Sequence, residues 1–296
     1  MPDPKLYLLA MASSVIASLL LVLVTLAVAR PASATRLNIA SILGIGFGLV
    51  VGYNVLSLRL AWPPANGLAR LLLIIVPSAI GVELIAGFPY IPRSVAWLMR
   101  ICLAAAAPRI LLHGSVYLNG PGSDLDRWQS AAQLVLCSIL LIGVWRLLTL
   151  LSERSPGISI PLALAMTAQS AGLTIMMAGY IKGGAATIPL AAALVGTTVA
   201  TELMRMRTRL LGTIGIGVVG LFGILFIGRF FGRLSTVCAL TLLLAPLLLW
   251  VTEMPMLRHR KSWLVGSLRL LLVAIPLAVV LVLAKQDFYL KMAPLL

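Results

Sequence analysis

The stretch WLMRICLAAAAPRILLHGSVYLNGPGSDLDRW, residues 97–128, indicates in which solvent the chain folds. Its first part is apolar enough to enter a lipid bilayer, although it contains Arg100, Arg109 and His113. Pro108 interrupts the apolar run, and the longest polar loop of the chain follows it. Such a segment is typical of a transmembrane helix that keeps a few polar side chains for contacts inside a bundle. We therefore expect the other segments to pack around it in a membrane.

The composition of the whole chain favours the same class. Apolar residues make up 61% of the 296 residues and charged residues only 10%, against about 25% charged in a soluble domain. The net charge is +15, and its cations stand at the ends of apolar runs, where they reach lipid headgroups. The expected partners are therefore anionic membrane lipids, together with a membrane-protein partner or a second copy of the chain, and not nucleic acid.

The hydrophobic runs predict an all-α, polytopic transmembrane bundle of about ten helices, with nine to eleven allowed, short loops and no soluble domain. Residues 1–296 are expected to form one domain. The first run is longer than the apolar region of a secretory signal, roughly 7–15 residues, which favours a retained helix. The expected helices cover about residues 6–29, 37–61, 68–88, 94–118, 128–151, 158–181, 187–203, 210–227, 234–251 and 263–284.

Cations near the helix ends suggest a repeat and an orientation. Residues 187–232 and 234–284 resemble each other weakly, because each unit has an acidic residue before a basic cluster, Arg205–Arg209 and Arg258–Lys261. The preference for cations at helix C-termini explains this equally well. The loops after odd-numbered helices carry the larger number of cations, so the positive-inside rule places both termini on the non-cytoplasmic side of a bacterial cytoplasmic membrane.

Arg109 and His113 are the first candidate site. With a helix that continues to residue 117, Arg109 lies about 12 Å inside it, near the bilayer midplane. His113 follows four residues later and shares its face. In one interpretation the two residues bind an anion or a headgroup. In the other, Arg109 is structural and pairs with a carboxylate or with carbonyl groups inside the bundle.

Glu83 is the one acidic residue expected within a span. In a hairpin of the third and fourth helices it lies close to Arg100, since both are one to two turns from the same membrane side. A structural ion pair is the preferred interpretation, because an unpaired buried charge is costly. A proton-coupling carboxylate is the alternative.

The helix expected at residues 158–181 is the most polar span. Thr167, Ser170 and Thr174 recur at helical spacing and form one stripe, and Gln169 lies at its midpoint. A water-lined substrate path and helix–helix hydrogen bonding both require such a stripe. These residues are substrate-binding candidates, and the sequence does not separate the two interpretations.

Gly44, Gly48 and Gly52 form a GxxxGxxxG face, which predicts close helix packing. The sequence contains no GxSxG, HExxH or Walker A motif. Its histidines, His113 and His259, are too few for a typical metal site. We therefore expect no catalytic residue, no metal and no cofactor.

Three functions agree with these patterns. The first is a carrier of a small or lipid-linked solute, which should show a polar cavity at the midplane beside the helix at residues 158–181. The second is a non-catalytic membrane subunit, which should be solid there. The third is an enzyme that acts on lipid headgroups through Arg109, His113 and the loop with Asp124 and Asp126. The missing catalytic motifs favour a protein that is not an enzyme.

Overall fold

The described part of the chain contains ten helical segments that are able to cross a membrane. The computed structural model describes residues 4–28, 33–58, 62–115, 124–155, 157–204, 210–253 and 262–291, and within these ranges it forms helices and no strands. Ten segments of this described part are long and apolar enough to span a bilayer. The predicted all-α class and the predicted ten spans are therefore confirmed, and the chain is an integral membrane protein.

Most spans are single helices. These are α1 (Pro4–Val28), α2 (Ala34–Val55), α5 (Arg93–Leu112), α7 (Asp124–Arg154), α8 (Ser159–Met177), α11 (Leu211–Phe230) and α14 (Ser262–Lys291).

Three spans are interrupted. The third span joins α3 (Gly67–Arg70), a π-helical turn η1 (Leu71–Ile75) and α4 (Val76–Ala86). The seventh span joins α9 (Ile181–Ala185) and α10 (Thr187–Leu203). The ninth span joins α12 (Thr236–Leu244) and a 3₁₀ segment η2 (Ala245–Glu253). Pro77 follows η1, and Pro246 lies in η2. Because proline has no N–H and its ring crowds the preceding turn, both prolines disfavour an unbroken α-helix.

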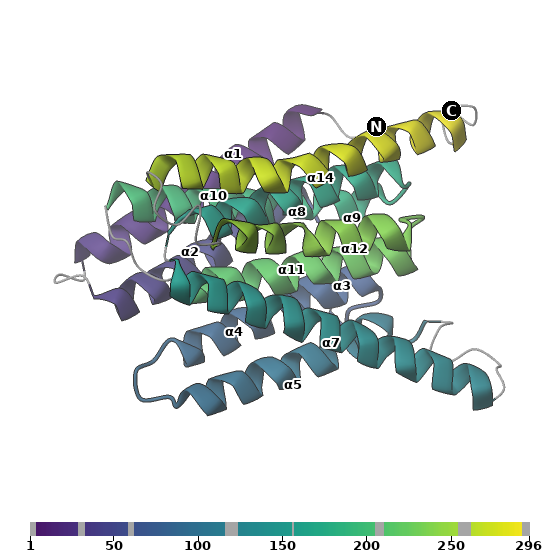
Figure 1. The fold of residues 1–296 in the computed structure, drawn as a ribbon, viewed down its shortest axis with the longest axis horizontal. Coiled ribbons are helices and arrows are strands. Elements are labelled where there is room, and N and C mark those ends of the chain that lie inside the picture. Colours follow the sequence, from purple (N-terminus) through teal and green to yellow (C-terminus); the bar gives the residue numbers. More distant parts are fainter. Residues whose placement is uncertain are drawn as a thin grey trace.

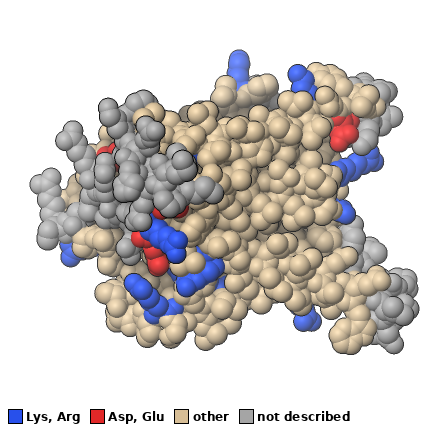
Figure 2. Space-filling model, in the orientation of Figure 1, with Lys and Arg blue, Asp and Glu red and all other residues tan. Residues whose placement is uncertain are grey.

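The helices lie side by side along the long axis of the molecule, and successive spans alternate in direction (Figure 1). The described chain therefore begins and ends at the same end of the bundle, which we call the termini side. The opposite end holds the end of α4, the beginning of α5 and the end of α7, and we call it the far side (Figure 1). On the face shown in Figure 2, charged side chains lie mainly toward these two ends.

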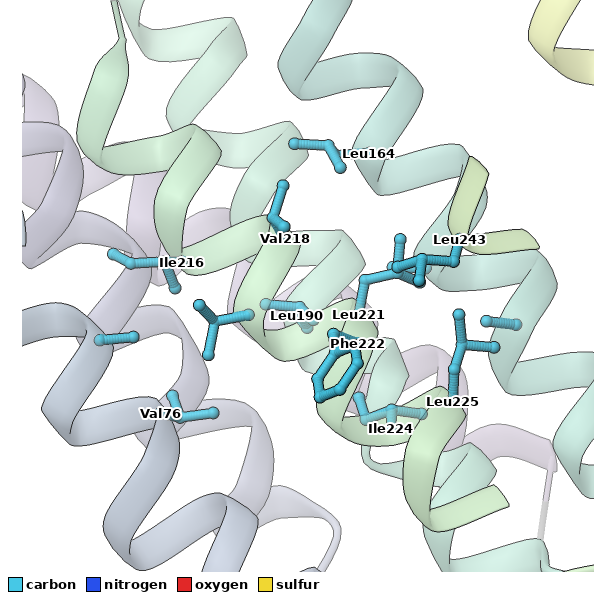
Figure 3. Packing of buried hydrophobic residues seen from close by; sticks show 14 of the residues in the cluster. Val76, Leu164, Leu190, Ile216, Val218, Leu221, Phe222, Ile224, Leu225 and Leu243 are labelled. Carbon is cyan, nitrogen blue, oxygen red and sulfur yellow. The ribbon is translucent and has the colours of Figure 1, made fainter. Parts of the chain in front are cut away.

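Helix α11 forms the centre of the bundle. It packs against α2, α4, α5, α7, α8, α10 and α12, and nearly all its residues are buried. Its glycines admit neighbouring side chains: a Cβ atom at Gly220 would lie 2.7 Å from Leu190, and one at Gly223 would lie 2.3 Å from Leu71. Figure 3 shows apolar side chains of this helix, such as Phe222, beside those of its neighbours, such as Leu190. The core is thus built from the large apolar side chains of α11 and its neighbours, and some of the neighbouring side chains pack against the α11 glycines.

Helices α1, α2 and α10 form a second region of close packing through the GxxxGxxxG face. A Cβ atom at Gly44 would lie 2.6 Å from Val22, and one at Gly52 would lie 2.1 Å from the Ser14 Oγ and 2.6 Å from Pro189. The Ser14 hydroxyl donates a 2.9 Å hydrogen bond to the Gly48 carbonyl. The glycines are therefore used for contacts within the chain, where they let backbones approach closely.

Several helix ends differ from the prediction. Helix α5 ends at Leu112 and not near residue 118, because the chain turns at His113 and Gly114, and Gly114 has a positive φ of 69°. Helices α7 and α14 are longer than expected. The loop at residues 119–123, the clusters Arg205–Arg209 and Arg258–Lys261, and His259 lie outside the described residues, and the proposed repeat stays a prediction.

Candidate functional site

Arg109 does not lie at the depth predicted from the sequence. Because α5 ends at Leu112, Arg109 is in its last turn on the termini side. Its side chain and that of His113 are exposed, and Arg109 makes no ion pair or hydrogen bond with any described residue. The expectation of a midplane cation held inside the bundle is wrong for this residue. The helix end instead lets the guanidinium extend toward headgroups, and a substrate role for the pair stays a prediction.

Glu83 and Arg100 meet inside the bundle. Arg100 donates two hydrogen bonds of 2.8 Å, from Nε to Glu83 Oε1 and from Nη2 to Oε2, and the two residues are 6% and 1% exposed. Gly215 of α11 makes room for this pair, since a Cβ atom there would lie 2.3 Å from the Glu83 Oε1. Such a bidentate pair satisfies both charges without water.

Two tryptophans surround the Arg100 guanidinium. Its Cζ atom lies 5.0 Å from the Trp97 ring centroid and 5.8 Å from that of Trp145. The Cζ atom of Arg146, on α7, lies 4.6 Å from the Trp97 centroid. The far side of α4, α5 and α7 therefore holds two guanidinium groups against one indole, and the Glu83 carboxylate pairs with one of them.

Arg269 of α14 forms the second buried cation site, which the sequence analysis missed. It is 6% exposed. Its guanidinium donates to the Thr252 Oγ1 at 2.7 Å, to the Ser159 Oγ at 3.2 Å, to the Ser155 Oγ at 2.8 Å and to a carboxylate oxygen of Glu253. These partners come from η2, from α8 and from the chain between α7 and α8, so one side chain joins three spans on the far side.

The hydroxyl stripe of α8 faces the core and is buried, and its Thr174 end borders a pocket of about 200 Å³. Thr167 is 0% and Thr174 1% exposed, and their hydroxyls donate to the carbonyls of Ala163 and Ser170 on the same helix. Ser170 is also buried. Gln169 lies on the other face, half-buried, with no hydrogen bond to a described residue. The structure thus separates the four candidates into three buried hydroxyl residues and one outward-facing amide.

A groove of about 370 Å³ opens on the termini side between α1, the α2–α3 connection, η1 and α9. Leu68, Leu72 and Ala185 form part of its apolar wall. Its polar groups include the ammonium group of Lys182, the one formally charged side chain among its described lining residues. Lys182 is exposed and makes no ion pair with a described residue.

The groove lies where two of the interrupted spans begin. Leu68 and Leu72 belong to α3 and to the π-helical turn, and Lys182 belongs to the short α9. Ser57, which also lines the groove, has a φ of 52°, a conformation that residues other than glycine rarely adopt. Broken helices, π-turns and such backbone outliers recur at binding sites. The groove is therefore a candidate site that no single sequence motif indicated.

Comparisons of the chain with models of known protein families and with curated proteins find no match. Among the described residues, no three His, Cys, Asp or Glu side chains come together in a way that could hold a metal ion. The function is therefore inferred from the groove, the buried hydroxyl stripe of α8 and the two buried arginines.

Proposed function

We propose that the protein is a carrier of a small amphipathic solute with an anionic group, and that the groove beside Lys182 is its entry site. The observation that carries this proposal is that the groove is built at two interrupted spans. Discontinuous helices are typical of secondary transporters, where they expose backbone groups to the solute. A groove of about 370 Å³ has the size of small-molecule sites, roughly 300–1,000 Å³.

The contacts on the far side indicate in which conformation such a carrier is seen. Arg100 and Arg269 each bind a carboxylate there and are buried, so α4, α5, α8, η2 and α14 are held together at that end. The groove opens at the other end. We propose that this is the conformation open to the termini side, and that the far side, with Arg93 and Arg154, faces the cytoplasm.

A non-catalytic membrane subunit is the second candidate, and the burial of Thr167 in the middle of α8 favours it. Thr167 and Thr174 bond to their own helix, and Thr167, in the middle of α8, is 0% exposed. Thr174, nearer the termini side, lines a pocket of about 200 Å³ together with Arg233 and Asp287. The GxxxGxxxG face, however, is already occupied by α1 and α10. A partner would therefore have to pack against the outer faces of α1, α7 or α14, where exposed side chains are mainly Leu, Ile and Val.

Binding of a matched pair of amphiphiles tests the proposal. Decyl phosphate and decyltrimethylammonium are titrated into the protein in a nonionic detergent, and binding is followed by the shift in Tm. We expect decyl phosphate to bind more tightly, and Lys182→Gln to weaken that binding about tenfold, as for the loss of one charge-assisted contact. Lys285→Gln, an exposed lysine on α14, is the control and should change nothing. Equal binding of both amphiphiles, or equal binding to the Lys182→Gln protein, would contradict the proposal.

A further inference from the structure

Arg146 lies within a membrane span, and no described carboxylate neutralises its charge. It lies eight residues before Arg154, the end of α7, and therefore about 12 Å from that end along the helix. Its side chain is exposed on the outside of the bundle. No described carboxylate forms an ion pair with it, because Glu83, the nearby acid, accepts both of its hydrogen bonds from Arg100. One positive charge of this cluster remains uncompensated.

A charge at this place needs a counter-ion from outside the chain. Insertion of an arginine into the apolar region costs roughly 2.5–3.5 kcal/mol, a cost that local polar partners lower. Arg146 faces outward and not toward the core, so its surroundings are lipid. The Trp97 ring holds the Arg146 guanidinium in place at 4.6 Å. Trp97 itself is four residues from the beginning of α5, about 6 Å from it, a depth typical of interfacial tryptophans.

The surface next to Arg146 has room for an acyl chain. Gly143 lies three residues before Arg146 and Ile139 seven residues before it, so all three share one face of α7. A Cβ atom at Gly143 would have no neighbour within 4 Å, and Ile139 is 59% exposed. The face therefore continues from the guanidinium toward the midplane as an open apolar strip.

We propose that Arg146 and Trp97 bind the phosphate of an anionic phospholipid whose acyl chain lies along Gly143 and Ile139. A guanidinium binds phosphate through two parallel N–H···O bonds. The Trp97 indole N–H is a further donor, since it has no acceptor among the described residues. The charge, the aromatic support and the apolar strip together fit a phospholipid and not a free anion. The Arg146 site lies on the far side and is separate from the groove beside Lys182.

Lipid retention tests this site. The protein in nonionic detergent is mixed with phosphatidylglycerol or phosphatidylcholine, and bound lipid is counted by native mass spectrometry. We expect phosphatidylglycerol to be retained preferentially, and Arg146→Leu to weaken its binding about tenfold. Lys285→Leu, which removes an exposed cation of α14 at the termini side, is the control and should retain the lipid as the unaltered protein does. Inorganic phosphate at the same concentration should not displace it.

A second variant covers the case in which Arg146→Leu does not fold. Gly143→Leu keeps every charge and has space for its side chain, but it fills the strip and should also lower phosphatidylglycerol retention several-fold. The proposal is overturned if neither variant reduces retention, if Lys285→Leu reduces it as much as Arg146→Leu, or if phosphatidylcholine is retained equally well. Displacement by inorganic phosphate would show an anion site without lipid specificity and would equally overturn it.

Discussion

Replacing Glu83 by leucine should destabilise the protein strongly, because it leaves the buried Arg100 guanidinium without its counter-charge. The pair has two charge-assisted hydrogen bonds of 2.8 Å, and each such bond contributes about 1.5–3 kcal/mol. Removal of one partner of a buried pair costs about 3–5 kcal/mol. The two figures agree, so we expect the free energy of unfolding to fall by about 3–5 kcal/mol in Glu83→Leu.

The double variant Glu83→Leu/Arg100→Leu separates the pair from the unpaired charge. Since a buried ion pair is often replaced by apolar residues at little cost, we expect the double variant to recover most of the lost stability. The unfolding free energy is measured in mixed micelles of a nonionic detergent and dodecyl sulfate. Tryptophan fluorescence is a suitable signal because Trp97 and Trp145 lie 5.0 and 5.8 Å from the Arg100 Cζ.

Two outcomes would refute this reasoning. A loss below about 1 kcal/mol in Glu83→Leu would mean that water or lipid reaches Arg100, contrary to its burial. A double variant that loses the sum of the two single losses would mean that the side chains stabilise the bundle independently.

Other substitutions should follow the contacts of each side chain in the same unfolding assay. Arg269→Leu removes a hydrogen-bonded group that joins three spans, so stability should fall by about 3–5 kcal/mol; an unchanged value would contradict the buried network. Gly52→Val places methyl groups against Ser14 and should lower the free energy of unfolding by about 1–3 kcal/mol. Gly81→Val has open space around it and should change stability little. Similar losses of stability in both variants would argue against the α1–α2 contact. Arg109→Leu should stay within about 0.5 kcal/mol of the unaltered protein, and a larger loss would show a partner for it.

The sequence predicts the ten spans well because the signal is local. A run of about 20 apolar residues indicates a span whatever surrounds it. The Gly44, Gly48 and Gly52 spacing likewise indicates a close contact, although it does not say that α1 and α10 occupy it. The proximity of Glu83 to Arg100 follows from a short hairpin, in which two residues equally far from the turn lie side by side.

The cation positions were harder to predict, because burial depends on where a helix ends and what packs on it. Arg109 is exposed since the turn at Gly114 ends α5 early. Arg146 and Arg269 carry the same signal that singled out Arg109, a charge within an apolar run. Ser159, however, is 110 residues from Arg269, and no local pattern brings them together.

The groove depends even more on tertiary structure. Its walls come from the beginning of α1, the α2–α3 connection and α9, which are far apart in sequence. Pro77 gives a local reason for a disturbed third span, but it does not predict a π-turn or its place beside Lys182. The candidate entry site could therefore be found only once the helices were placed.

The carrier proposal requires that the closed centre of the bundle opens to water in another conformation. Thr167, 0% exposed in the middle of α8, is replaced by cysteine in a chain whose Cys102, Cys137 and Cys238 are changed to serine. Its reaction with a membrane-impermeant maleimide is then followed in membranes, with Leu148→Cys, a buried apolar position on α7, as the negative control. We predict slow but complete labelling of Thr167→Cys and none of Leu148→Cys. A Thr167→Cys protein that stays unlabelled, while Ser57→Cys in the groove reacts, would contradict the carrier and favour the membrane subunit.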